Sequence, residues 1–324
     1  MNRWLLSGVL LLLLTVTATG QDQYALIVSG ASGGEPFRER HEQWRTHLVT
    51  VLRNQPGFDE KHLTVLGETP GPDVGRASRE GVFQALDALA ERVPQDAVVY
   101  VVLIGHGTFD GTDAKFNLVG PDLSATDWDT LLTRFRGQVV FVNTTAASSP
   151  FIDRLSQPGR VVVTATESPV QRFDTTFPQF FVEAFTEPAA DRDKNGQVSV
   201  LEAFEFASDQ VRRWYQRRGR LSTERALIDD NGDRRGREAG QPGPDGRLAA
   251  RLYLGAGPPD DPEINDPVLA PLIAERRALL TALDELRATK DSLPETTYRA
   301  ELERTLVALA RLSRDIRRRT ASVL

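Results

Sequence analysis

Five short apolar runs constrain the fold of this chain more than any other feature of its sequence. Few polar residues interrupt them, as is typical of strands that are buried on both faces of a sheet. They span residues 24–30, 63–68, 97–105, 138–143 and 160–166. Stretches with apolar residues at helical spacing separate most of them. The alternation predicts an α/β fold in which helices sandwich a mostly parallel sheet.

The helical stretches have a stripe of apolar residues on one face. In the first, the stripe consists of Phe37, Trp44, Leu48, Val51 and Leu52. Helices are predicted over residues 36–54, 77–93, 125–135, 149–156, 175–185 and 200–218. One more strand is predicted over residues 247–254.

Small polar residues and a histidine follow the predicted strands. They are Ser29, His106, Asn143 to Thr145, and Thr164 to Glu167. In parallel sheets, sites form at the carboxyl ends of the strands. We therefore expect these residues to gather at one edge of the sheet.

The N-terminus has the pattern of a secretory signal peptide. Arg3 precedes an apolar stretch with five consecutive leucines, and the small residues Ala18 to Gly20 follow it. The apolar stretch is shorter than the roughly 20 residues that a spanning helix needs. We expect cleavage after Gly20 and an exported protein, periplasmic or secreted, with no membrane contact after cleavage; an uncleaved anchor is the alternative.

The overall charge and the absence of cysteine narrow the functional classes. The net charge is −6, whereas nucleic-acid binders usually carry a basic excess, so no nucleic-acid partner is expected. The 324 residues include no cysteine, so no disulfide can form even in an oxidising compartment.

Residues 191–202, DRDKNGQVSVLE, match the EF-hand calcium loop. Calcium binds six to eight oxygens, and alternate residues of this tight loop supply them. The matching positions are Asp191, Asp193, Asn195, the turn residue Gly196, the carbonyl of Gln197, Ser199 and the closing Glu202. The sequence predicts a structural Ca²⁺ here. An acidic loop that merely caps the following helix is the alternative.

A second acidic loop, residues 229–238, is a weaker candidate. Asp229, Asn231 and Asp233 have the right spacing, but Arg234 takes the turn position. Whether a second metal binds there stays open.

The C-terminal residues 268–324 have two leucine-rich stripes separated by a break near Pro294. They predict two helices folded as an antiparallel, coiled-coil-like hairpin. The stripe either seals the hairpin or docks it on the main domain, or else it provides a surface for oligomerisation or a partner. A Gly- and Pro-rich linker, residues 255–267, precedes it, so the expected domains are a signal peptide (1–20), an α/β domain containing the calcium loop (21–254), the linker and the hairpin.

One predicted strand ends in Ile104-Gly105-His106-Gly107 and the next in residues 141–146, FVNTTA. These two strand ends resemble the clan of cysteine peptidases that includes legumain, caspases and gingipains, and most of all its bacterial legumain-like members. The segments YALIVSGASGG (24–34) and FNLVGPDLSATDW (116–128) are also similar to that clan. The resemblance covers roughly residues 24–186 and implies a caspase-like fold.

The resemblance implies roles for single residues. His106 matches the general base, Gly107 could offer an oxyanion N–H, and Thr145 stands where the clan has its cysteine, with Thr144 one step away. It also implies that Glu167 and Asp174 could bind a basic group of a substrate. A threonine hydroxyl is a far weaker nucleophile than a thiolate and needs a base oriented by a third group.

The third group is not evident from the sequence, where Asp110 and Asp113 are candidates. Three hypotheses follow. The first is a catalytically degenerate peptidase homologue, a pseudoenzyme, that binds a peptide or protein. The second is an active hydrolase that uses Thr145, Thr144 or Ser148 with His106. The third is an unrelated doubly wound domain in which His106 is structural. His41, His47 and His62 are interpreted as solvated.

Overall fold

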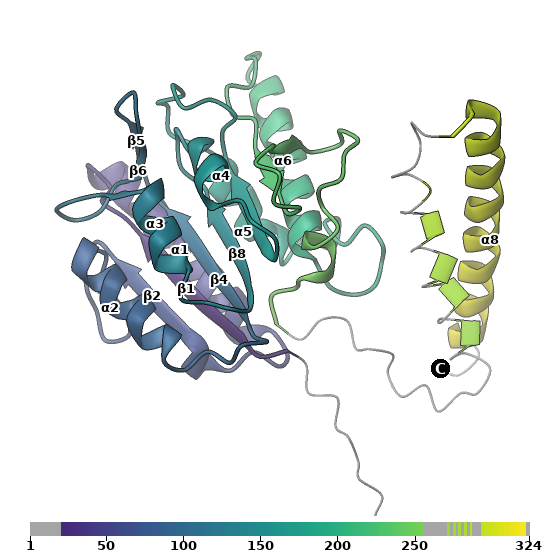
Figure 1. Ribbon diagram of the computed structural model, residues 1–324, viewed down its shortest axis with the longest axis horizontal. Coiled ribbons are helices and arrows are strands. Elements are labelled where there is room, and N and C mark those ends of the chain that lie inside the picture. The colour runs from purple at the N-terminus through teal and green to yellow at the C-terminus, as the bar shows by residue number, and fades with distance from the viewer. Residues whose placement is uncertain are drawn as a thin grey trace, which may run out of the picture.

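The computed structural model describes residues 21–255 and 293–321, together with part of the segment between them (Figure 1). In that segment it describes residues 271, 272, 275, 276, 278, 279, 282, 283 and 286, all helical. The predicted signal peptide and almost all of the predicted linker lie outside the described residues. No helix among the described residues is both long enough and apolar enough to cross a membrane.

An eight-stranded sheet forms the centre of the α/β part, with its strands in the order β11-β10-β9-β8-β4-β1-β2-β3. Its strands are β1 Gln23–Ser29, β2 Leu63–Gly67, β3 Gly75–Arg76, β4 Val98–Ile104, β8 Gln138–Asn143, β9 Arg160–Thr164, β10 Leu227–Asp229 and β11 Arg237–Glu238. The first six of these pair in parallel, and β10 and β11 add an antiparallel edge. The predicted α/β class with a mostly parallel sheet is confirmed.

Helices cover both faces of this sheet (Figure 1). One face packs against α1 Glu35–Asn54, α5 Phe177–Ala184 and α6 Val200–Gln216. The other packs against α2 Arg79–Ala90, α3 Ala125–Leu132 and α4 Pro150–Leu155. The two layers explain why the strands are apolar throughout: alternate residues serve different cores.

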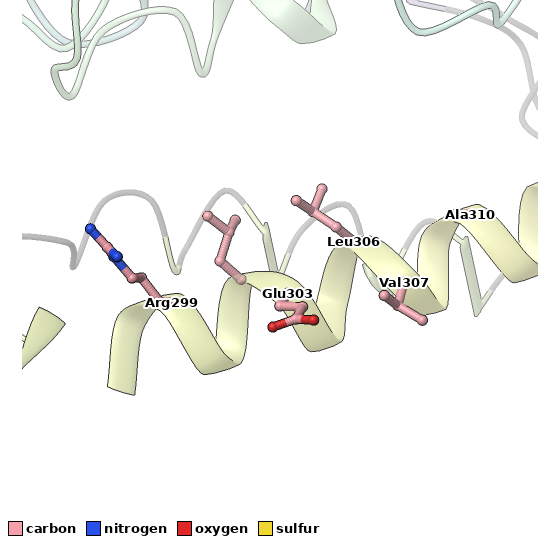
Figure 2. Close-up of a pocket in the computed structure, with 6 residues that line it drawn as sticks. Arg299, Glu303, Leu306, Val307 and Ala310 are labelled. Carbon is pink, nitrogen blue, oxygen red and sulfur yellow. The ribbon is translucent and has the colours of Figure 1, made fainter. Parts of the chain in front are cut away.

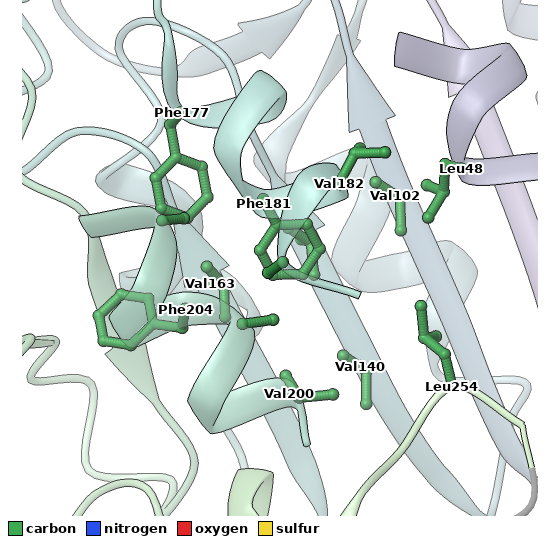
Figure 3. Close-up of a cluster of buried hydrophobic side chains, with 14 of the residues drawn as sticks. Leu48, Val102, Val140, Val163, Phe177, Phe181, Val182, Val200, Phe204 and Leu254 are labelled. Atoms are coloured by element: carbon green, nitrogen blue, oxygen red, sulfur yellow. The ribbon is translucent and has the colours of Figure 1, made fainter. Parts of the chain in front are cut away.

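β1 illustrates the division between the two cores. Ala25 and Ile27 belong to the first core, and Leu26 and Val28 to the second. In the first core, side chains from α1, α5 and α6 converge on the middle strands (Figure 3). They include Leu48, Phe181, Val182 and Phe204, with Val102, Val140 and Val163 from the sheet.

The register of the middle strands brings their carboxyl ends level. Ser29 lies beside Ile104, Leu103 beside Asn143, and Asn143 beside Thr164. The loops that leave β1, β4, β8 and β9 therefore start from one edge of the sheet.

Short elements that the apolar runs did not predict complete the fold. A second, antiparallel sheet contains β5 Gly107–Phe109, β6 Ala114–Phe116 and β7 Leu123–Ser124. A 3₁₀ helix, η1 Glu60–His62, precedes β2. The strand predicted over residues 247–254 is wrong: this segment contains the 3₁₀ helix η2 Ala249–Arg251 and one bridge between Ser199 and Tyr253. Val200 N–H donates to the carbonyl of Leu252, so the segment follows the start of α6 instead of joining the sheet.

The C-terminal part contains α8, Glu295–Ala321. Leu279 and Leu286 share a cavity with Thr305 and Ala308, which shows that the described residues before the break lie against α8. Leu283 is buried, as are Leu312 and Ile316 of α8, and none of the three belongs to the two cores of the sheet domain. Part of α8 lines a second, shallow groove of about 370 Å³ that includes Leu306 and Val307 (Figure 2).

Candidate functional site

The His-Gly pair after β4 lies directly against the residues that follow β8. A Cβ atom on Gly107 would come within 2.4 Å of Thr145 Oγ1 and 2.3 Å of the Ala146 carbonyl oxygen. A residue without a side chain is therefore required at position 107. The structure places His106, Gly107 and Thr145 at the same edge of the sheet, as the strand pattern predicts.

His106 is held by contacts on both ring nitrogens. Its Nε2 lies 2.8 Å from the carbonyl oxygen of Ser32. A carbonyl can only accept, so Nε2 carries a hydrogen. Nδ1 faces Asp174, with 3.7 Å between Nδ1 and Oδ1. The other oxygen of Asp174 accepts a hydrogen bond from Arg40 of α1.

Asp174, and not Asp110 or Asp113, is the carboxylate that faces the imidazole. Asp110 instead accepts from Lys115 and from the backbone N–H groups of Thr112 and Asp113. The sequence-based choice of Asp110 or Asp113 as the third group is wrong. Asp174 lies in the loop after β9. This loop leaves the sheet at the same edge as His106, because β9 pairs in parallel with β8. The resemblance had pointed to Asp174 only as a substrate-binding residue.

His41 was interpreted as solvated from the sequence, but it is buried within this site. It is 1% exposed, and its ring centroid lies 5.1 Å from that of His106. Phe37, His41, Trp44 and Leu48 follow one another at helical spacing on α1. That spacing is the signal that could have identified His41, because a position on the apolar stripe points toward the sheet.

Burial keeps the ring of His41 neutral. Burial, with smaller contributions from the neighbouring His106 and Arg40, lowers the pKa of His41 to about 4. Neither ring nitrogen has a hydrogen-bond partner among the described residues. An unpaired buried polar group costs about 1–3 kcal/mol, so this histidine is an unusual occupant of a core position.

The hydroxyl of Thr145, which the resemblance aligns with the clan's cysteine, is buried and bonded to other groups. Thr145 is 0% exposed. Its Oγ1 lies 2.8 Å from Asn143 Oδ1 and 3.1 Å from the carbonyl oxygen of Ala146. A nucleophile must reach both its base and the substrate. In this arrangement the hydroxyl is directed to Asn143 and Ala146, while the ring nitrogens of His106 are directed to Ser32 and Asp174.

The two alternative nucleophiles are buried as well. Thr144 donates its hydroxyl to the carbonyl of Leu103 at 2.7 Å. The Oγ of Ser148 lies 3.1 Å from the hydroxyl of Thr166, whose backbone N–H also donates to it. All three hydroxyls therefore stabilise the turn after β8.

The predicted calcium loop brings its acidic residues together. Carboxylate oxygens of Asp191, Asp193 and Glu202 all lie within 4.8 Å of one another. Gly196 has φ of +91°, which suits glycine at the sharp turn. Asn195 accepts from the N–H of Gln197. The set offers oxygen ligands to a hard cation.

Hydrogen bonds from the protein itself orient the carboxylate of Glu202. One of its oxygens accepts from the backbone N–H groups of Arg192 and Asp193, and the other from Ser199, in a capping box that begins α6. Burial raises the pKa of Asp193, and the charges of Glu202 and Asp191 raise it further. A bound cation would relieve this repulsion, so the donor set fits a metal.

Hydrogen bonds from its own backbone and from neighbouring segments occupy the carboxylates of the second acidic loop. Asp229 accepts from Gly232 N–H and from Ser156. Asp230 accepts from the N–H groups of residues 246, 248 and 249. Burial raises the pKa of Asp245 to about 6. Among the described residues, two groups of side chains have ligand atoms close enough to share a metal. No residue of this loop belongs to either group.

No protein-family model matches the sequence, and no curated protein matches it significantly. Many solved structures are similar, among them three at 10–13% sequence identity. Protein GSU0716 from Geobacter sulfurreducens is 13% identical at a TM-score of 0.45, over 72% of this chain and 99% of its own. Caspase-1 from Spodoptera frugiperda is 12% identical at a TM-score of 0.47, over 74% of this chain and 94% of its own.

The third structure, Raptor from Chaetomium thermophilum, is 10% identical at a TM-score of 0.36. The match covers 89% of this chain but 25% of Raptor. All three TM-scores lie below 0.5. Membership of the caspase, legumain and gingipain clan therefore remains a hypothesis that depends on this chain's own strands and site.

The buried His41 predicts a loss of stability in mild acid. A histidine whose pKa is lower in the folded than in the unfolded chain stabilises the fold above its unfolded pKa, and this contribution is lost as the pH falls toward its folded pKa. Between pH 7 and pH 5, the shift from 6.5 to about 4 is worth about 2 kcal/mol. Urea unfolding should show that wild type loses about this much more than His41→Phe. Parallel pH profiles for the two proteins would contradict the interpretation.

Proposed function

We propose that this chain is an exported, catalytically degenerate homologue of the legumain-like peptidases that binds a peptide or protein at the His106 edge of its sheet. The supporting features are a parallel sheet whose strand ends carry the His-Gly pair and the turn of small residues, in the order found in that clan. The absence of cysteine from the whole chain removes the clan's nucleophile.

The burial of the Thr145 hydroxyl carries the proposal. An active hydrolase would need this group exposed to the substrate and in contact with an imidazole nitrogen. Instead it is bonded to Asn143 and packed beneath Gly107. The clan's thiol is absent, and the Thr145 hydroxyl in its place stabilises the turn after β8.

A binding role is supported by the loop that carries Asp174. In this loop Val170 and Phe173 are 66% and 69% exposed. Isolated apolar residues on a surface are common. Here two of them lie within four residues of each other, directly before the carboxylate that faces His106. We therefore assign the contact with a partner peptide to this loop, residues 168–174.

Purified protein should not hydrolyse peptides, including those that contain Asn or Asp. A mixed peptide library analysed by mass spectrometry should give the same absence of products for wild type, His106→Ala and Thr145→Ala. Turnover by wild type that disappears in His106→Ala would overturn the proposal and support an active hydrolase.

The same library should contain peptides that the protein retains without cutting. Phe173→Ser should reduce their retention about tenfold or more, since an exposed aromatic contact is lost. Leu306→Ser, which removes an exposed apolar side chain from α8, is the matched control and should behave as wild type. Equal retention by all three proteins would exclude the loop as the binding surface.

Calcium binding at residues 191–202 forms the second part of the proposal. Asp191, Asp193, Asn195, the carbonyl of Gln197 and Glu202 would hold the ion. It would fasten the loop to the start of α6, which packs in the first core.

Calcium should raise the melting temperature of the protein. At 100 times its dissociation constant a ligand adds about 2.7 kcal/mol, which for a domain of this size corresponds to a rise of roughly 5–10 °C. Glu202→Gln should lose the response to calcium and chelator, because it keeps the helix cap but removes the charged ligand. Glu205→Gln, one turn further along α6, should keep it. A wild-type melting temperature that ignores both calcium and chelator would reject the calcium loop.

A further inference from the structure

Three side chains with metal-ligating atoms converge at the edge of the sheet. They are His41 of α1, His106 after β4 and Asp174 in the loop after β9. One ligand atom from each lies within 4.8 Å of the others. The group lies apart in sequence from the acidic loop at 191–202, and it is different in kind, since two of its three members are imidazoles.

The hydrogen bond of His106 leaves the lone pair of Nδ1 available to a metal. Its Nε2–H donates to the carbonyl of Ser32, so the lone pair of the neutral ring is on Nδ1. A metal-bound histidine commonly donates its second ring N–H to a backbone carbonyl in this way. The free nitrogen is the one that faces Asp174.

The separation of Nδ1 and the carboxylate fits a shared ion better than a direct bond. At 3.7 Å, Nδ1 and Asp174 Oδ1 are too far apart for a hydrogen bond. Two metal–ligand bonds of about 2.1 Å that meet at about 110–125° span roughly 3.4–3.7 Å. An ion between the two atoms would therefore need little movement of either side chain.

His41 supplies the independent observation. It is 1% exposed, and neither of its ring nitrogens has a partner among the described residues, although its ring packs against that of His106. A ligated metal would satisfy one of these nitrogens. The metal–nitrogen bond would offset the free-energy cost of burying an unpaired imidazole.

Arg40 is the one cation that the structure shows bonded to this group. Arg40 donates to Oδ2 of Asp174, whereas Oδ1 is the oxygen that faces His106. In that position it orients the carboxylate from outside, as hydrogen-bonded partners of metal-ligating carboxylates do. Its charge will weaken the affinity but does not occupy the ligand position.

We propose that His41, His106 and Asp174 form a binding site for a divalent transition metal ion, with Zn²⁺ as the first candidate. Two imidazoles and one carboxylate suit zinc, and also copper, nickel or iron, and do not suit calcium. His106 and Asp174 are partly exposed, so a fourth position is open to water or to a ligand from a partner. The site does not depend on whether the protein binds peptides.

Calorimetric titration of the full chain with ZnCl₂, in saturating Ca²⁺ so that the acidic loop does not compete, tests the site. Wild type should bind one Zn²⁺ per chain. His41→Phe and Asp174→Asn should weaken binding tenfold or more. His47→Gln removes another histidine of α1 from outside the group and should bind as wild type. Binding that is equal in all four proteins, or no binding by wild type, would overturn the proposal.

Substitution of His41 in the core could prevent folding, so a second measurement on intact protein is needed. Co²⁺ added to wild type should give the visible absorption of a four- or five-coordinate site, and excess Zn²⁺ should abolish it. Asp174→Asn, which changes a partly exposed residue, should lose the signal while keeping its fold by circular dichroism. A spectrum of hexaaquo Co²⁺ in wild type would reject the site.

Discussion

The parallel pairing of β1, β4, β8 and β9 is the constraint on which the rest of this molecule depends. Because each of these strands is buried on both faces, its apolar residues fix the register, and the register sets where the chain leaves the sheet. His106, Thr145 and Asp174 come from separate loops, yet they meet because those loops leave one edge. A shift in register would separate them even if every residue were retained.

At that edge the hydroxyl of Thr145 is part of the packing. Thr145 lies under Gly107 and bonds to Asn143, so its hydroxyl stabilises the turn. The Nε2 atom of His106 bonds the carbonyl of Ser32, and its Nδ1 atom faces Asp174, which also accepts from Arg40. The ring of His106 also packs against the buried ring of His41, so two imidazoles lie at this edge.

The sequence predicted the large elements well because strong apolar patterns specify them. The five buried runs correspond to β1, β2, β4, β8 and β9, and the helical stripes correspond to six helices of the sheet domain. Strands of two or three residues, such as β3 and β10, escaped prediction because they are too short to show an apolar pattern and are recognised only by their pairing. The segment 247–254 was mistaken for a strand because its apolar residues pack beside α6.

The site was predicted in part for a similar reason. His106 and Thr145 follow long strands, so their edge could be inferred. Asp174 could not be paired with His106 from the sequence, because the path of a loop decides where it lies. His41 was missed for a different reason: a polar residue on an apolar stripe was judged by its type, although its spacing from Phe37 and Trp44 placed it inside.

The capping box of α6 has a consequence for the acidic loop before it. Ser199 and Glu202 already close the first turn of the helix with their own hydrogen bonds. The backbone N–H groups of Arg192 and Asp193 donate to the same carboxylate. One carboxylate thus joins the backbone of the loop to the first turn of the helix, so removal of the Glu202 side chain would loosen both segments together.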